Sequence, residues 1–200
     1  KQIVDTPIKI ILHDVASTFE PCVKYLKSAQ DSGNFIVYKN KENNHKSVMN
    51  SVKSYLADHP ECTHYVITDP DIELNEVNGD ILEFYMTLCN KYPNLVVGPM
   101  LRICDIPNHY PKKSTVIESH TRQFYRHSPF QTEFKNKKYD IQFAKIDTTF
   151  QMAKREFLPN TFPNKGIRCR SPYDARHLDW YIDPNNMSED QIYYSKKASV

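Results

Sequence analysis

Along the first hundred residues of the chain, apolar and polar residues follow two patterns in turn, one typical of strands and one typical of helices. Short, β-branched apolar runs of strand length lie at 8–12, 35–38, 64–68 and 95–97. Between these runs, apolar residues three and four positions apart indicate helices at 18–30, 47–58 and 80–91. The repeated strand–helix order predicts an α/β fold with a mostly parallel central sheet flanked by helices.

The periodicity of apolar residues is weaker in the second hundred residues. Segment 110–138 shows no clean periodicity, so we expect loops and short elements there. Strand-like alternation returns at 139–145 and 148–154, and Ser188 with Gln191 forms a capping box that predicts a last helix. The sequence therefore predicts an irregular C-terminal half.

Composition narrows the class of protein. A length of 200 residues suffices for a real core, and a net charge of +2 gives no general attraction to nucleic acid. No apolar run approaches the ~20 residues that cross a bilayer, so we expect no membrane span. The five cysteines form no CxxC pair, which argues against a zinc ribbon and favours reduced thiols in the cytoplasm. Because no composition break is strong enough to mark a linker, we expect a single domain over 1–200.

Glycine usage excludes two common ways of binding a nucleotide. The chain has only four glycines, at Gly33, Gly79, Gly98 and Gly166, whereas a P-loop or a GxGxxG turn needs glycines two to five residues apart. A nucleotide would have to be held by another device, most simply a metal ion bound to its phosphates.

Two carboxylates mark the end of the third predicted strand. Asp69 and Asp71 directly follow the apolar run 64–68, where ligands of α/β sheets bind. Mg²⁺ and Mn²⁺ prefer oxygen ligands and are often held by one or two carboxylates together with substrate phosphates. The alternative is a plain turn in which Asp71 caps a short helix.

A second group of reactive side chains lies within 173–183. A general base must be a carboxylate or an imidazole within reach of the attacking hydroxyl. The candidates are Asp174 and Asp179 as base, Arg176 as the partner of a diphosphate, His177 as a metal ligand, and Trp180 and Tyr181 as stacking surfaces. The alternative is a structural turn, with Trp180 in the core and Asp174 paired with Arg176.

A strand that ends in Asp-x-Asp, after an alternating α/β half and before a His/Asp/Trp cluster, resembles the glycosyltransferases of the GT-A type. More closely, the chain is similar to the N-terminal domain of multidomain glycosyltransferases encoded by chlorella viruses. The stretch 43–50 loosely resembles the helix start of family-2 enzymes, and 147–150 resembles the strand beneath their acceptor site. The resemblance implies a GT-A fold, a bound Mn²⁺ or Mg²⁺ and a UDP-sugar donor.

The resemblance also implies roles for individual residues. Half 1–100 would bind the nucleotide sugar and half 101–200 the acceptor. The implied residues are Asp71, Asp69 and His177 for the metal; His13, Asp14, Tyr38, Asn40, Lys46, Asp69 and Arg176 for the donor; and Asp179, or else Asp174, for the base.

The activity that the resemblance implies is transfer of glucose, or a deoxyhexose such as rhamnose, to a glycan acceptor hydroxyl with inversion. The setting would be synthesis of a viral capsid glycan in the host cytoplasm, by a longer polypeptide with further domains. One alternative is a nucleotidyltransferase that makes a sugar nucleotide, although residues 13–16 lack its glycine-rich basic loop. Another is a non-enzymatic module that binds glycan or nucleic acid through 110–138, but an aromatic ladder for single strands is missing there, so we expect no nucleic-acid partner.

Overall fold

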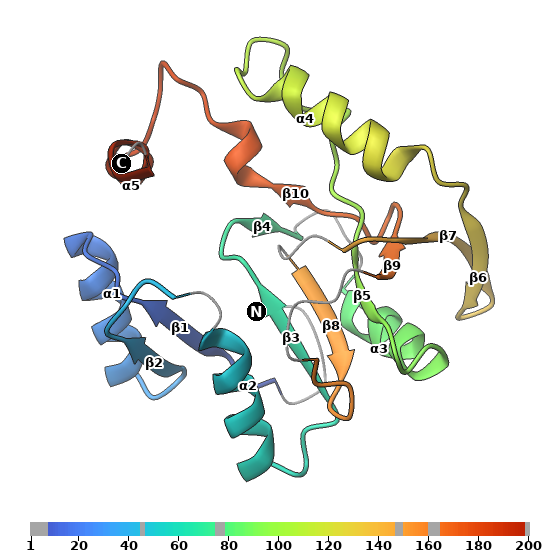
Figure 1. Ribbon diagram of the computed structural model, residues 1–200, viewed down its shortest axis with the longest axis horizontal. Helices are drawn as coiled ribbons and strands as arrows, with labels where there is room; N and C mark the ends of the chain where they lie inside the picture. The colour runs from blue at the N-terminus through green and yellow to red at the C-terminus, as the bar shows by residue number, and fades with distance from the viewer. Residues whose placement is uncertain (1–7, 45–46, 75–78, 147–149, 160–164, 199–200) are drawn as a thin grey trace. The chain divides into compact units, whose positions relative to one another are not determined.

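The computed structural model divides into two compact units (Figure 1). One unit comprises Pro60–Asn186 with Lys1–Val4, and the other comprises Asp5–His59 with Met187–Val200. The expectation that 1–200 forms a single domain stays a prediction. None of the helices in the described part of the chain has the length and apolar character that a bilayer crossing requires. The residues that the structure describes are 8–44, 47–74, 79–146, 150–159 and 165–198.

The larger unit is built on a six-stranded sheet in the order β3-β8-β5-β9-β7-β6. Within it only β5 and β9 are parallel neighbours, and every other adjacent pair is antiparallel. The α/β class is confirmed, but the predicted mostly parallel sheet is wrong, because β8 lies antiparallel between β3 and β5 (Figure 1). The strands are β3 (His64–Thr68), β5 (Val96–Pro99), β6 (Phe130–Phe134), β7 (Lys137–Ala144), β8 (Phe150–Lys154) and β9 (Gly166–Cys169).

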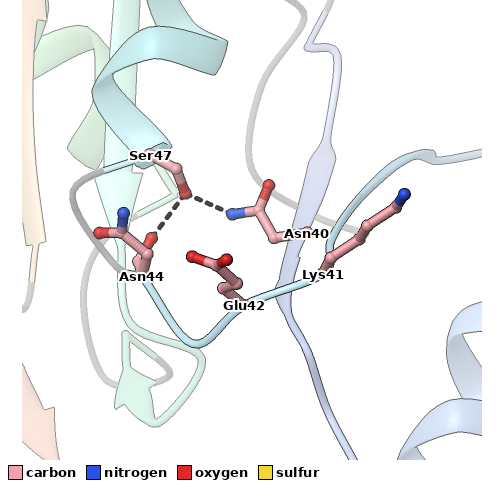
Figure 2. Close-up of a pocket in the computed structure, with 5 residues that line it drawn as sticks. All are labelled: Asn40, Lys41, Glu42, Asn44 and Ser47. Atoms are coloured by element: carbon pink, nitrogen blue, oxygen red, sulfur yellow. Dashed lines mark hydrogen bonds between the residues drawn. The ribbon is translucent and has the colours of Figure 1, made fainter.

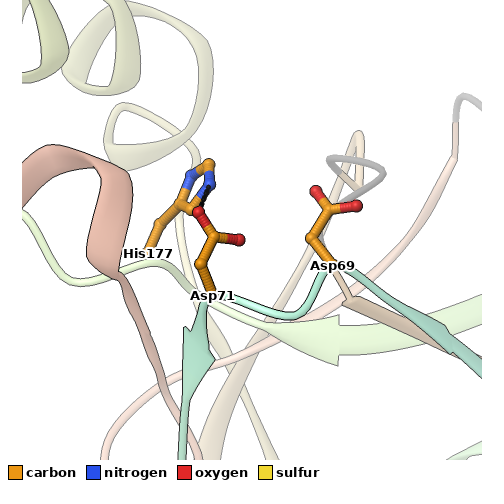
Figure 3. Close-up of side chains that lie close together, drawn as sticks. All are labelled: Asp69, Asp71 and His177. Atoms are coloured by element: carbon orange, nitrogen blue, oxygen red, sulfur yellow. Dashed lines mark ion pairs between the residues drawn. The ribbon is translucent and has the colours of Figure 1, made fainter. Parts of the chain in front are cut away.

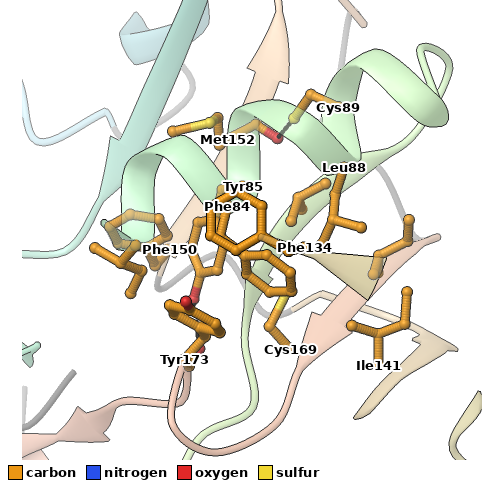
Figure 4. Close-up of a cluster of buried hydrophobic side chains, with 13 residues drawn as sticks. Phe84, Tyr85, Leu88, Cys89, Phe134, Ile141, Phe150, Met152, Cys169 and Tyr173 are labelled. Carbon is orange, nitrogen blue, oxygen red and sulfur yellow. Dashed lines mark hydrogen bonds between the residues drawn. The ribbon is translucent and has the colours of Figure 1, made fainter. Parts of the chain in front are cut away.

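The main core lies between this sheet and α3 (Ile81–Lys91). The predicted apolar face of α3 is buried through Ile81, Phe84, Tyr85 and Leu88, as Figure 4 shows in part. The ring of Phe84 stacks on that of Tyr173 at 4.2 Å, and the Tyr85 hydroxyl donates a hydrogen bond of 2.7 Å to the Tyr173 carbonyl. These contacts fix the first residue of the predicted cluster at 173–183.

The segment that the sequence leaves without a clear period contacts the side of the sheet that carries the Arg168 and Gln142 side chains. It contains α4 (Lys113–His120) and a π-helical turn, η1 (Thr121–Tyr125). Phe124 of η1 lies 3.7 Å from the guanidinium of buried Arg168, and its carbonyl accepts a hydrogen bond from Gln142. The expectation of an irregular C-terminal half is therefore wrong in part, since this half also supplies β6, β7, β8 and β9.

The smaller unit contains a parallel pair, β1 (Ile11–Val15) and β2 (Ile36–Asn40), joined through α1 (Glu20–Asp31). It also contains α2 (Ser47–Asp58) and α5 (Glu189–Ala198). The first strand begins three residues later than predicted, because its register with β2 starts at Ile11 opposite Ile36. His13 and Asp14 consequently lie within β1 rather than after it.

Candidate metal centre

A two-residue ladder brings the two predicted clusters together. β4 (Ile72–Glu73) follows Asp71 directly and pairs antiparallel with β10 (Arg176–His177). In this register His177 lies opposite Ile72, and the backbone N–H of Leu178 donates a 2.8 Å hydrogen bond to the Asp71 carbonyl. Residues far apart in sequence are thus held side by side by main-chain bonds.

Asp69, Asp71 and His177 form a cluster of metal-ligand type (Figure 3). Each offers one ligand atom, and these atoms all lie within 4.8 Å of one another. Two atoms that each lie about 2.1–2.4 Å from one ion are at most about 4.8 Å apart, so the spacing suits a shared divalent cation. His177 Nε2 lies 3.1 Å from Asp71 Oδ2.

The charges of the cluster act on one another. Burial alone would raise the pKa of Asp71, but the hydrogen bond and the charge of His177 outweigh it and lower that pKa. Burial alone would lower the pKa of His177, but Asp71, with Asp179 and Asp69, raises it. His177 Nδ1 is buried and has no hydrogen-bond partner among the described residues. Two carboxylates and an imidazole are a donor set that Mn²⁺ and similar ions accept, so the residues fit a divalent cation.

Arg176 supports the ladder that carries His177. Its guanidinium donates to Asp105 Oδ2 from Nε at 2.7 Å and pairs through Nη1 with Glu73 Oε2 at 3.1 Å. The Tyr181 hydroxyl donates to the other Asp105 oxygen at 2.5 Å. Arg176, expected at the diphosphate, is thus engaged with two protein carboxylates, and its donor role stays a prediction.

The two predicted base candidates have different surroundings. Asp174 is largely buried and is held by Arg102, which donates from Nη2 to Oδ1 at 3.0 Å and from Nε to Oδ2 at 3.3 Å. The side chain of Asp179 is 32% exposed and meets Lys112 Nζ at 2.5 Å. The alternative of an ion pair between Asp174 and Arg176 does not match these partners. Asp179 lies two residues after His177, so it belongs to the rim of the cluster.

Trp180 packs in the core, as the structural interpretation of this segment expects. Its side chain is 7% exposed and belongs to a cluster with Leu101, Ile106 and Ala175. Its ring centroid lies 5.0 Å from that of His177, so the indole packs against this candidate ligand.

Sequence reasoning did not identify Lys112, Glu73 and Asp105 as parts of this site, and it expected Tyr181 to be a stacking surface rather than the partner of Asp105. Glu73 and Asp105 are the partners of Arg176. Glu73 lies in a two-residue ladder and Asp105 in a turn, and neither has a periodic pattern that would predict it. Lys112 stands at the start of a helix whose short apolar face, Val116 and His120, gives little signal.

The residues expected to hold the nucleotide base lie in the smaller unit. His13 Nε2 is 3.1 Å from Ser47 Oγ and 3.0 Å from Asn40 Nδ2, and Tyr38 lies opposite His13 in the strand register. Asp14 Oδ1 accepts a hydrogen bond from the Ser17 N–H. Lys46 lies outside the described residues. Base binding by these residues stays a prediction.

A pocket of about 200 Å³ opens beside this group (Figure 2). Asn40 donates a hydrogen bond to Ser47, and the Ser47 hydroxyl donates one of 2.6 Å to the Asn44 carbonyl. The lining is polar and suits a hydrogen-bonding ligand. The lining residues are Asn40, Lys41, Glu42, Asn44 and Ser47.

Comparisons with family models, with curated proteins and with solved structures found no match to this chain. The cluster of Asp69, Asp71 and His177 therefore stands on its own geometry, and the resemblance to GT-A glycosyltransferases stays a prediction.

Proposed function

We propose that the chain is a metal-dependent glycosyltransferase of the GT-A type that transfers a sugar from a UDP-sugar to an acceptor hydroxyl. The observation that carries the proposal is the convergence of Asp69, Asp71 and His177 at the end of β3. Further support comes from the α/β architecture of the larger unit and from the lack of any glycine-rich phosphate loop in the sequence.

Asp69, Asp71 and His177 would hold the cation and leave its remaining positions for phosphate oxygens of the donor. When bound, the cation supplies Lewis-acid stabilisation of the negative charge on the departing diphosphate. His177 must be neutral to act as a ligand, so binding of the cation would replace its contact with Asp71.

Asp179 suits the role of base better than Asp174. A base must reach the acceptor hydroxyl, and the Asp174 carboxylate is buried in a two-point contact with Arg102. In the proposed single displacement, the acceptor oxygen bonds to the anomeric carbon as the bond from that carbon to the phosphate oxygen breaks. The electron pair leaves with UDP, and the proton of the acceptor goes to Asp179. One base suffices, so the configuration would invert.

The donor sugar, glucose or a deoxyhexose such as rhamnose, and the setting in viral capsid-glycan synthesis belong to the proposal through the resemblance alone. So do a cytoplasmic location and further domains of a longer polypeptide. The nucleotidyltransferase alternative has no particular contact in the structure that favours it.

The test is a panel of nucleotide sugars with and without Mn²⁺, scored by thermal shift and by release of the free nucleotide. We expect a UDP-sugar to stabilise the protein and to be hydrolysed slowly only when Mn²⁺ is present. Asp71→Asn should abolish both effects, whereas Asp140→Asn, which changes an exposed carboxylate on β7, should not. Pyrophosphate release from UTP and a sugar phosphate, without hydrolysis of any nucleotide sugar, would favour the nucleotidyltransferase instead.

A further inference from the structure

Lys112 places a positive charge at the rim of the metal-ligand cluster. Its ammonium nitrogen contacts Asp179 Oδ2 at 2.5 Å. The backbone N–H of Asp179 in turn donates a hydrogen bond to the Asp71 carboxylate, and the charge of Asp179 acts on His177. Asp179 therefore links Lys112 to two of the three candidate ligands, Asp71 and His177.

The contact between Lys112 and Asp179 is of a kind that breaks easily. The side chains are 47% and 32% exposed, and ion pairs this accessible to water stabilise a protein little. The next residue, Lys113, differs, because its ammonium donates to the Ile106 carbonyl and to Asn108 Oδ1. Lys113 thus ties down the loop before α4, whereas Lys112 is directed at Asp179.

A bound diphosphate carries negative charge that an accessible lysine can balance. The two negative charges of Asp69 and Asp71 together balance the charge of a divalent cation. The negative charge of a bound diphosphate therefore needs a further positively charged side chain. Arg176 and Arg102 lie nearby, but each is held by protein carboxylates and is less exposed than Lys112. A lysine ammonium is a mobile point charge that suits phosphate oxygens.

We propose that Lys112 binds the diphosphate of the substrate and that Asp179 holds it in the absence of substrate. This inference rests on the proposed function and names a substrate-binding residue for it. When Lys112 moves to the phosphate oxygens, the Asp179 carboxylate loses its cation. The same movement thus completes anion binding and leaves Asp179 ready to accept the proton of the acceptor.

The rival explanation is that the pair merely ties α4 to η2 (Leu178–Tyr181). The two explanations differ in what they predict for the anion affinity of two variants, Lys112→Ala and Asp179→Asn. If Lys112 binds the anion, Lys112→Ala weakens anion binding, whereas Asp179→Asn strengthens it by removing a competing carboxylate. If the pair is only a tether, both variants lose the same contact and shift anion binding in the same direction.

The experiment is calorimetric titration of the full chain with UDP and with inorganic pyrophosphate at saturating Mn²⁺. We expect Lys112→Ala to weaken both about tenfold or more, Lys112→Arg to restore most of the affinity, and Asp179→Asn to tighten both several-fold. Lys135→Ala is the matched control, since Lys135 is 49% exposed and pairs with Asp80 and Glu83 on another part of the unit. Melting curves identify any variant that fails to fold.

Unchanged binding by Lys112→Ala, or equal weakening by Asp179→Asn, would overturn the assignment of Lys112. If Mn²⁺ and a UDP-sugar still bind and Asp71→Asn abolishes this, the proposed function survives that failure. If the wild-type protein binds no Mn²⁺, the proposed function fails, and the inference built on it fails with it.

Discussion

Asp105 receives two hydrogen bonds that favour its ionised form, one from Arg176 Nε and one from the Tyr181 hydroxyl. Partial burial alone would raise the pKa of Asp105, but the bonds from Tyr181 and Arg176 outweigh it and hold that pKa below its ordinary value. A carboxyl group with a lowered folded-state pKa stabilises the fold above its unfolded pKa, and this stabilisation is lost as pH falls through the folded pKa.

We therefore expect the free energy of unfolding to decrease as pH falls below about 4, with Asp105 contributing to the slope. Asp105→Asn should make this dependence shallower, because an amide does not titrate. Urea unfolding at several pH values between about 7 and about 3 measures the slope for both proteins. An unchanged slope in the variant would show that Asp105 is not held ionised by these partners.

At the scale of residues, the sequence indicates most of the candidate metal centre. Asp69 and Asp71 follow an apolar strand, and His177 stands in a dense reactive segment, so both halves of the cluster are visible without coordinates. The ion-pair partner of each charged side chain is not visible, because the sequence does not show which carboxylate lies beside which cation. Asp174 and Asp179 were both candidates for the base, and only the contacts with Arg102 and Lys112 distinguish them.

At the scale of elements, the β4–β10 ladder positions His177, and Arg176 crosses it to Glu73. We expect Arg176→Met to lower the free energy of unfolding by about 1–3 kcal/mol, because Glu73 and Asp105 lose a partly buried counter-charge. Mn²⁺ affinity should fall several-fold as His177 loses its support. Denaturant unfolding and Mn²⁺ titration check these effects, with Arg126→Met, an exposed arginine after η1, as the control.

Two outcomes would contradict this account of the ladder. If Arg176→Met unfolds like the wild type, the ion pairs do not stabilise the fold. If Arg126→Met loses Mn²⁺ affinity to the same degree, the effect of Arg176 on the cluster is a general effect of removed positive charge.

The elements that the sequence predicts best are those with a strong period. α3 was predicted from apolar residues three and four apart, and its bounds agree closely. α4 was missed because it buries only Val116 and His120. The turn between β6 and β7 was missed as well, because Lys135 and Asn136 adopt positive φ angles of 49° and 60° without the glycine that usually marks such a turn.

At the scale of the whole chain, pairing of distant strands could not be read from local patterns. The order of strands and helices suggested parallel neighbours, but β8 arrives from far along the chain and pairs with both β3 and β5. Local periodicity indicates that a strand exists and which face is apolar, but not which strand lies beside it. The α/β class was thus predictable and the mixed sheet was not.

The division into units leads to a prediction about fragments. All six strands of the large sheet, its hydrophobic clusters and the three candidate ligands lie within 60–186. A fragment of this length can bury a core of its own, so we expect 60–186 to unfold cooperatively and to bind Mn²⁺. Fragment 60–146 lacks β8 and β9 and should not fold. Circular dichroism melts compare the two, and an unfolded 60–186 would contradict this prediction.

The proposed function depends on the binding of one divalent cation by Asp69, Asp71 and His177. Its most direct test is titration of the full chain with Mn²⁺, in which the electron paramagnetic resonance signal reports the free ion. We predict one bound Mn²⁺ per wild-type chain, an affinity at least about tenfold lower in Asp71→Asn, and no change in Asp140→Asn. Absence of bound Mn²⁺ in the wild type, or equal affinity in wild type and Asp71→Asn, would contradict the proposal.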